Sequence, residues 1–134
     1  MYSQQQPGYG MQGGYGMQPM GNTSGQGPQA VVPAEVQGLN WGAFFWNWIW
    51  AIFNNAGIVW ILVGLFFSPV ASIYLLIKGN ELAWQNKPWA SVEAFKSTQR
   101  KWAIAGLILV VGSILLACVF GILGGLLGAL SNSN

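Results

Sequence analysis

The sequence contains no histidine and no aspartate, and it has a single cysteine, Cys118. Without histidine the chain lacks the commonest general base and metal ligand, and it cannot form a Ser–His–Asp unit. One cysteine allows neither an internal disulfide nor a cysteine metal cluster. The acidic residues are Glu35, Glu81 and Glu93. We therefore predict that the protein is not an enzyme and has no catalytic residue, no metal site and no cofactor.

Charged side chains are also scarce. They make up 6% of the 134 residues, whereas a soluble domain has about 25%. Hydrophobic residues make up 53% and lie mostly after the first thirty positions. This distribution predicts an all-α integral membrane protein whose partner is membrane lipid.

Residues 1–35 are rich in Gln, Gly, Tyr and Met and have no charge before Glu35. The sequence Gly-Tyr-Gly-Met-Gln occurs at 8–12 and again at 14–18. Such a segment buries too little apolar surface to offset the entropy of ordering, so we predict a disordered tail. It is either a solvated tail with no partner or a weakly associating segment that recruits an unknown protein. Because it contains no Lys or Arg, nucleic-acid binding is not expected.

Residues 36–134 are predicted to form a helical membrane domain with apolar segments at 41–53, 58–77 and 103–130. The turn sequence at 54–57, Asn-Asn-Ala-Gly, separates the first two. Segment 58–77 is long enough to span, and Ser68-Pro69 inside it marks either a helix restart or a kink. Segment 103–130 is the clearest crossing, since its 28 residues contain no charge.

Segment 41–53 allows two interpretations. Four tryptophans crowd its surroundings, and Asn40, Asn47 and Asn54 recur every seven residues as a polar stripe on roughly one helical face. It either crosses the membrane with this stripe facing other helices, which we favour, or lies along the interface. We therefore predict two or three membrane-crossing helices.

The segment 78–102 is the water-facing part of the domain. Ser91 is expected to cap an amphipathic surface helix that starts at Val92 and continues into 103–130. Asn80 and Glu81 either cap a helix or form a surface pair, which we favour, or they form a polar site with Gln99 and Arg100. The basic residues mark the loop as cytoplasmic, with the C-terminus outside; they are Lys78, Lys87, Lys96, Arg100 and Lys101. The N-terminus is cytoplasmic with three crossings and outside with two.

The last apolar segment carries small residues four positions apart. Such a ladder lets two helix backbones approach closely in lipid. We expect this face to pack against another helix, either within the chain or in a homo-oligomer. The ladder consists of Ser113, Ala117, Gly121, Gly125 and Ala129.

Three blocks resemble a family of small uncharacterised bacterial membrane proteins: Leu39 to Phe44, Lys78 to Trp84, and Val92 to Ala103. The resemblance covers about residues 39–125 and leaves out the tail, where some relatives carry a zinc ribbon whose cysteines are absent here. It implies a bacterial inner (plasma) membrane protein with a cytoplasmic N-terminus, and it implies no activity.

Two functions follow as hypotheses. The first is a non-enzymatic scaffold or interaction protein that self-associates through the small-residue ladder. The alternative is a small transport or channel component with the asparagine stripe lining a polar path. No charged residue would lie along that path, which disfavours ion or proton coupling.

Overall fold

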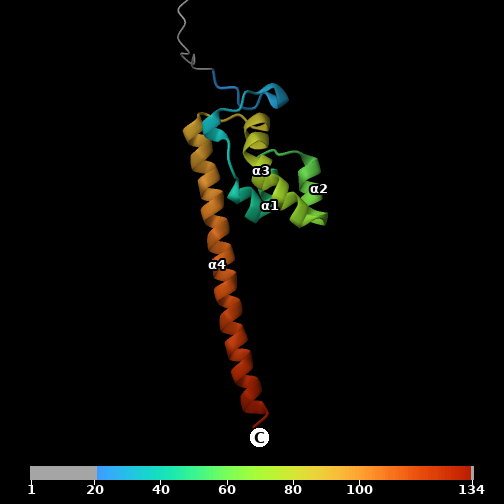
Figure 1. Ribbon diagram of the computed structural model, residues 1–134, viewed down its shortest axis with the longest axis vertical. Helices are drawn as coiled ribbons and strands as arrows, with labels where there is room; N and C mark the ends of the chain where they lie inside the picture. The colour runs from blue at the N-terminus through green and yellow to red at the C-terminus, as the bar shows by residue number, and fades with distance from the viewer. Residues whose placement is uncertain (1–20, 134) are drawn as a thin grey trace, which may run out of the picture.

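The computed structural model describes residues 21–133, and within that range the chain is all-helical (Figure 1). Four α-helices follow two short 3₁₀ turns. Their bounds are η1 Gly27–Gln29, η2 Ala34–Val36, α1 Trp41–Phe53, α2 Ile58–Phe66, α3 Ser68–Asn86 and α4 Val92–Ser131.

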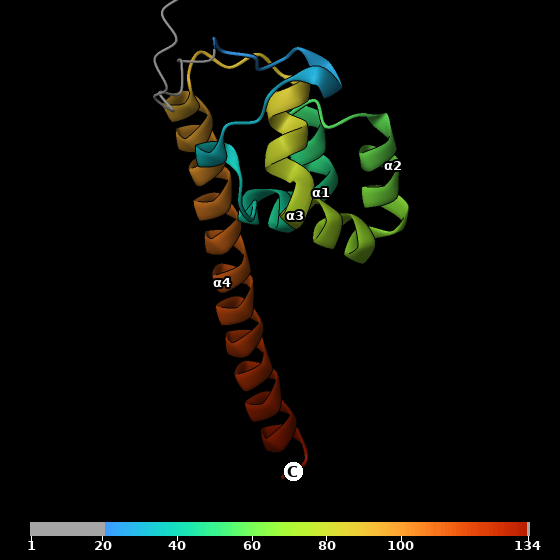
Figure 2. The ribbon, with the colours of Figure 1, turned by 45° about the horizontal axis from the view of Figure 1, so that its top comes forward.

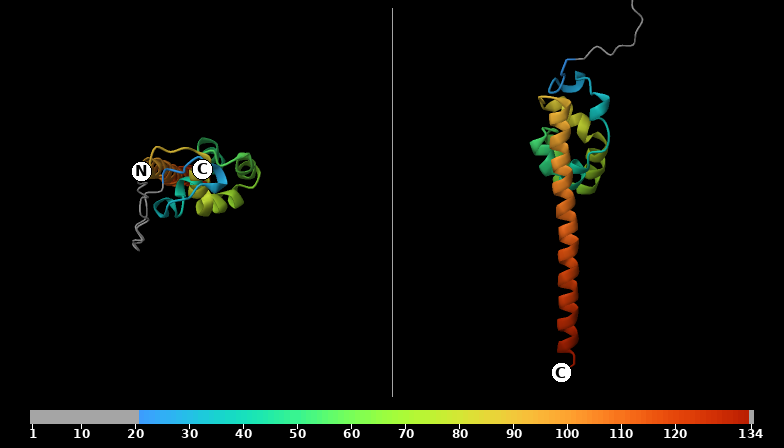
Figure 3. Two further views of the ribbon diagram at one scale, coloured as in Figure 1. Left: turned by 90° about the horizontal axis from the view of Figure 1, so that it is seen from above. Right: turned by 90° about the vertical axis from the view of Figure 1, so that its left-hand side faces the viewer.

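The molecule has two unlike parts. Helix α1 packs against the N-terminal part of α4, and α3 and α2 pack on α1 to complete a head, whereas the rest of α4 extends alone (Figures 1 and 3). Gly106 is the last buried residue of α4, and every described residue after it is exposed. We call residues 21–106 the head and residues 107–131 the free part of α4.

Helix α1 reverses direction at its middle. Asn47 has non-helical backbone angles, φ 47° and ψ −114°, which break α1 into two arms. Three hydrogen bonds place α1 along α3. The Asn40 backbone amide, at the start of α1, donates to the Leu76 carbonyl, and the Asn47 side chain, in its middle, donates to the Ser68 carbonyl. The Phe53 carbonyl, at the end of α1, accepts a hydrogen bond from Lys87. The first arm therefore runs toward the beginning of α3, and the second arm runs back toward its end (Figure 2).

The two arms of α1 form one V-shaped pair, and helices α2 and α3 form a second V-shaped pair beside it. The predicted restart at Ser68-Pro69 is confirmed, because α2 ends at Phe66 and α3 begins at Ser68. The junction lies at the end of the head from which the free part of α4 extends (Figure 2). We call this end, where both V-shaped pairs have their tips, the lower end of the head.

Local sequence explains most helix boundaries. The Asn40 side chain accepts a hydrogen bond from the Ala43 amide at the start of α1, and the Ser91 hydroxyl accepts one from the Ala94 amide at the start of α4. The turn at 54–57 has positive φ at Asn55 and Gly57, a conformation that Asn and Gly adopt most readily. The expected cap at Ser91 and the continuous α4 are therefore confirmed.

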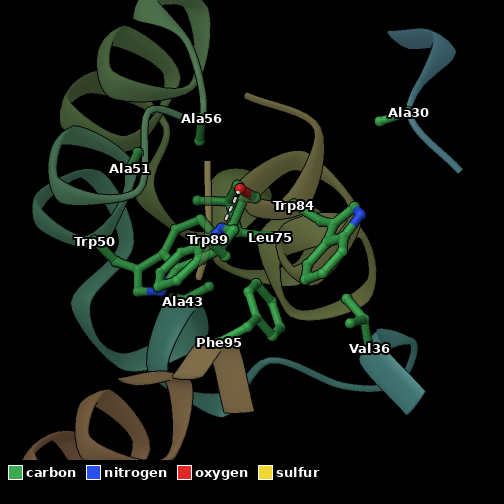
Figure 4. Packing of buried hydrophobic residues seen from close by; sticks show 11 residues of the cluster. Ala30, Val36, Ala43, Trp50, Ala51, Ala56, Leu75, Trp84, Trp89 and Phe95 are labelled. Atoms are coloured by element: carbon green, nitrogen blue, oxygen red, sulfur yellow. Dashed lines mark hydrogen bonds between the residues drawn. The ribbon is translucent and has the colours of Figure 1, made fainter. Parts of the chain in front are cut away.

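The head encloses an aromatic core (Figure 4). Phe95 of α4 meets Trp84 edge-on at 5.7 Å and Trp89 at 5.0 Å between ring centroids. The Trp89 indole donates a hydrogen bond of 2.9 Å to the Ala83 carbonyl, so its polar atom is satisfied inside the core. Trp50 and Leu75 complete the core from α1 and α3.

The prediction of a disordered tail over 1–35 is wrong for residues 21–35; residues 1–20 lie outside the described range. The Gly25 amide donates to the Trp84 carbonyl at 2.8 Å, and the Trp84 indole donates to the Val31 carbonyl at 3.2 Å. Ala30, and Val36 just after this range, are buried against the head. These long-range bonds and apolar contacts supply the ordering free energy that composition alone did not suggest.

The prediction of two or three crossings is not confirmed. In the described range, α4 alone is long and apolar enough to cross a membrane. Helix α1 has 13 residues with a reversal in the middle, and α2 has 9. Helix α3 has 19 residues, but Lys78 and Glu81 lie within it. The break at Ser68 therefore divides 58–77 into two helices that turn back on each other.

Candidate functional site

A network of buried side-chain amides joins three helices in the head. The Asn40 Nδ2 group of α1 donates to Asn80 Oδ1 of α3 at 2.7 Å and to Gln99 Oε1 of α4 at 3.0 Å. Gln99 Oε1 also accepts from the Trp50 indole at 2.8 Å, and Gln99 Nε2 donates to Asn54 Oδ1 at 2.8 Å. Gln99 thus lies at the centre and uses both polar atoms of its amide.

The network is fully satisfied and well buried. Asn40 is 3% exposed, Asn54 is 0% and Gln99 is 9%. The Asn54 amide closes the network by donating to the Trp50 carbonyl at 3.0 Å. Because every member bonds to another group of the head, the network fixes the relative positions of α1, α3 and α4.

A second polar contact ties the tips of the two V-shaped pairs together. The Asn47 Nδ2 group lies 2.8 Å from the Ser68 carbonyl, 2.8 Å from the Ser68 hydroxyl and 2.9 Å from the Ser72 hydroxyl. Asn47 Oδ1 is buried and has no hydrogen-bond partner among the described residues. It lies against Gly64 of α2, where a Cβ atom would collide with it. Gly64 is therefore required for this close approach.

Other glycines let the helices of the head approach each other. A Cβ atom at Gly42 would lie 2.5 Å from the Trp102 Cβ, and one at Gly106 would lie 2.6 Å from the Phe45 Cβ. A Cβ atom at Gly79 would lie 3.1 Å from the Ala43 Cβ. The sequence alone does not distinguish these glycines, because their partners are far away in the chain, whereas the four-residue ladder is visible as a local pattern.

The three asparagines of the predicted stripe do more than share a face. Asn40 is the N-cap of α1, Asn47 is its break and Asn54 is its C-cap. Each therefore lies where the helical backbone ends or reverses, and each bonds to neighbouring helices or to backbone freed at that point. These bonds agree with the expectation that the stripe faces other helices, whereas the crossing of segment 41–53 that accompanied this expectation is not confirmed.

Asn80 contributes to a polar site and not to a helix cap. It lies inside α3, so the cap half of the favoured interpretation is wrong. As the alternative anticipated, Asn80 and Gln99 meet, although they meet through Asn40. Glu81 pairs with Lys78 at 2.7 Å on the surface, as the surface-pair half of the favoured interpretation predicts. This hydrogen bond, and then the charge of Glu81, raises the pKa of Lys78 above its ordinary value.

The five basic residues of the predicted loop lie on the head, away from its lower end. Lys87 donates to the Phe53 carbonyl at 3.0 Å, and its ammonium group lies 4.8 Å from the centre of the Trp89 ring. Lys78, Lys96, Arg100 and Lys101 are exposed. Along α4 all charged residues precede Trp102.

The small-residue ladder, Ser113 to Ala129, lies entirely on the free part of α4. Cβ atoms at Gly121 and Gly125 would meet no atom of the described chain within 4 Å. Packing of this ladder within the described part of the chain is therefore absent, and the whole face is open. Cys118 is exposed on the same helix.

The lower end of the head is apolar on its outer surface. Phe66 is 76% exposed and Phe67 is 65% exposed at the α2–α3 junction. Further up the two helices, the Trp60 and Tyr74 rings stack at 3.8 Å. Exposed apolar residues continue along both helices away from the junction, and they are Ile58, Val59, Leu62, Leu65, Val70, Ile73 and Ile77.

Among residues 21–133 no group of three or more His, Cys, Asp or Glu side chains is placed to hold a metal ion. No family model, curated protein or solved structure matches the chain. The resemblance of residues 39–125 to the bacterial family therefore stays a prediction. The features on which function can be argued are the amide network, the apolar lower end and the free part of α4.

Proposed function

We propose that the protein is a non-enzymatic membrane protein of the scaffold or interaction type, with one crossing helix and a head seated in one leaflet. The observation that carries the proposal is the free part of α4. Its residues are exposed on every side and almost all apolar. In water this surface would be strongly unfavourable, because each exposed Leu, Ile or Phe side chain forgoes roughly 1.5–3 kcal/mol of burial. Lipid removes that penalty.

The dimensions of α4 agree with a crossing. The run from 103 to 130 is 28 residues long, or about 42 Å at about 1.5 Å per residue. A bilayer with its headgroup layers is about 40–45 Å thick. Lys101 and Trp102 at one end are typical membrane-interface residues, and the polar residues from Ser131 onward follow the other end.

A similar boundary is present on α3. On α3, Tyr74 and then Lys78 follow the apolar tip, just as Trp102 and then Lys101 precede the apolar run of α4. Tyr and Trp favour the headgroup level, and Lys favours the water beyond it. From Ser68 to Tyr74 is about 9 Å at about 1.5 Å per residue. Helices bound to one leaflet reach about 5–10 Å deep.

One crossing, in place of the two or three expected, assigns the sides of the membrane. The basic residues of the head favour the cytoplasm, so residues 21–106 are cytoplasmic and the C-terminus lies outside. This orientation agrees with the cytoplasmic N-terminus that the family resemblance implies. On the family resemblance, we propose that this membrane is the bacterial inner membrane.

Interaction is the function that this arrangement supports best. The ladder face of α4 is open to lipid and is suited to a second copy of the helix, which makes a homo-oligomer part of the proposal. The transport alternative has no comparable support. Asn40 and Asn54 are satisfied inside the head, and Asn47 is held between Ser68 and Ser72.

The depth of the head tests the proposal. In a Cys118→Ser background, Phe67→Cys carries a nitroxide label, and the full chain is reconstituted into phosphatidylcholine–phosphatidylglycerol vesicles. We expect the label to collide with dissolved oxygen more than with a water-soluble nickel complex, as a lipid-buried label does. A label on native Cys118 is the lipid reference.

The matched water reference is Ser97→Cys in the same background, because Ser97 is exposed on the part of α4 that precedes Lys101. If the label at 67 behaved like the one at 97, the head would not be seated in lipid. If the label on Cys118 also met the nickel complex, α4 would not cross the bilayer and the whole proposal would fail.

A further inference from the structure

The two leaflets of the membrane meet very different amounts of this protein. At the head, α1 packs against α4, and α3 and α2 extend the head away from α4 (Figure 1). Beyond the tips at Asn47 and Ser68, α4 continues alone (Figure 2). Seated as proposed above, the protein displaces lipid around several helical segments in one leaflet and around a single helix in the other.

The inserted part of the head is held as one body. Asn47 binds the tip of the second V through Ser68 and Ser72. The amide network ties α1 to α4 through Gln99 and ties α3 to α1 through the bond between Asn40 and Asn80. A body with these internal bonds cannot flatten to share its volume between the leaflets, so it acts on one leaflet as a wedge.

Lipid is the occupant that fits the outer surface of this wedge. From Ile58 to Ile77 the surface has no charged side chain and presents exposed apolar residues on both α2 and α3. On α3 it is bounded by Tyr74 and then Lys78, residues of the types that bound the apolar run of α4, and on α2 the Trp60 ring stacks on Tyr74 at the same level. A second protein docked there would need no such common boundary, whereas a lipid leaflet imposes one on every helix that enters it.

We propose that the protein prefers membranes that are convex on the side of its head. An insertion that expands one leaflet lowers its energy where that leaflet is stretched by curvature, and the affinity of interfacial helices depends on curvature for this reason. This inference rests on the proposed seating of the head. It adds a preference for membrane shape, by which a scaffold would be concentrated at curved regions of the envelope.

The test uses the full chain with Cys118→Ser and a fluorescent label on Ser97→Cys. The protein is reconstituted into giant phosphatidylcholine–phosphatidylglycerol vesicles, and a thin tether is pulled from each. A membrane-impermeant quencher added outside distinguishes molecules whose head faces out from those whose head faces in. We expect head-out molecules to be enriched about two-fold or more in the tether relative to lipid. Head-in molecules should be depleted, since their leaflet is concave there.

Two variants separate the wedge from the crossing helix. Replacing Phe66 and Phe67 with Ser makes the tip polar and should bring the head-out ratio close to one, while α4 still anchors the protein. Replacing both with Leu keeps the tip apolar and should retain the enrichment. Because the two orientations of the unaltered head are compared directly, the test does not depend on the Ser variant folding.

A head-out ratio of one or less would overturn the inference. If the label at 67 were lipid-exposed and the ratio were one, only the curvature preference would fail. A disulfide between Phe67→Cys residues of two copies, with no lipid exposure of that position, would mean that a second copy covers the face. That result would overturn both the wedge and the proposed seating.

Discussion

The head and the free part of α4 use the same residue types in opposite ways. In the head, glycines are sites of close contact, as where Gly106 meets Phe45 and Gly42 meets Trp102. In the free part, Gly121 and Gly125 meet nothing within 4 Å among the described residues. Small residues on a helix therefore mark a packing face only when their packing partner is identified. Within residues 21–133 the partner exists for one set and not for the other.

Polar residues follow the same division. The head buries four side-chain amides, Asn40, Asn47, Asn54 and Gln99, whereas the free part of α4 has Ser113, whose hydroxyl bonds to its own helix at Val110. The head is therefore held by specific bonds and shape, and the free part is held as a helix by its backbone alone. Substitutions in the two parts should differ accordingly, and all eight tryptophans lie in the head, so indole fluorescence reports its unfolding.

The largest loss of head stability is expected for Gln99→Leu. It leaves the Trp50 indole and Asn54 Oδ1 buried without their partner and removes one of the two bonds of Asn40 Nδ2. At roughly 1–3 kcal/mol for each orphaned group, we expect roughly 3–5 kcal/mol less free energy of unfolding. Urea unfolding in mild detergent, followed by tryptophan fluorescence, measures it. Gln37→Leu, on the surface, should change stability by less than about 0.5 kcal/mol; equal effects of the two would refute the central role of Gln99.

The next largest effect should come from Gly106→Leu. The new side chain collides with Phe45 and forces α1 and α4 apart, which costs about 1–3 kcal/mol for overpacking of this kind. Gly112→Leu is the matched control, because it lies on the same helix with open space around it. The same unfolding experiment should find that variant as stable as the native head. A similar loss at both positions would mean that the free part also packs within the chain.

A smaller difference is expected between two substitutions at Asn47. Both Ala and Gly remove the bonds to Ser68 and Ser72, but the backbone there has φ 47°, which glycine tolerates better. Asn47→Ala should therefore be less stable than Asn47→Gly by about 1 kcal/mol. If the alanine variant were the more stable, the reversal of α1 at this residue would be in doubt.

The smallest effect on the head should come from Gly121→Ile with Gly125→Ile. We expect unchanged head unfolding, but roughly ten-fold weaker self-association, because the added branches keep two helices apart. Chemical crosslinking in membranes measures the association. The control changes Leu123 and Leu127 to Ile on the opposite helical face. Unaltered crosslinking of the glycine variant would remove the ladder as the contact between copies.

Local signals in the sequence predicted much of the helical layout. The Ser91 cap, the restart at Ser68-Pro69 and the turn at 54–57 depend on neighbouring residues, and all three are present. The reversal at Asn47 was missed. Its seven-residue spacing from Asn40 and Asn54 also fits a continuous helix, and only the contact with Ser68 distinguishes the two.

The amide network was partly visible from sequence. The sequence predicts Asn80 and Gln99 in one polar site as the less favoured alternative. In the structure they are linked through Asn40, which is 40 residues from Asn80 and 59 residues from Gln99 along the chain, and this link depends on how α1 folds back. The ordered segment from 21 to 35 was hidden for the same reason, since its bonds are to Trp84 and Trp89, far along the chain. Composition indicates how much apolar surface a segment can bury by itself, but it does not indicate which hydrogen bonds and apolar contacts a distant segment provides.

The side of the membrane on which Asn55 lies tests the single crossing most directly. In a Cys118→Ser background, Asn55→Cys, Ser97→Cys and Ser133→Cys are each treated in intact cells with a membrane-impermeant maleimide. We predict that Ser133→Cys reacts from outside, whereas Asn55→Cys and Ser97→Cys are both protected until the membrane is opened. Labelling of Asn55→Cys from outside would mean that 58–77 crosses the bilayer after all, and it would contradict a head seated in one leaflet.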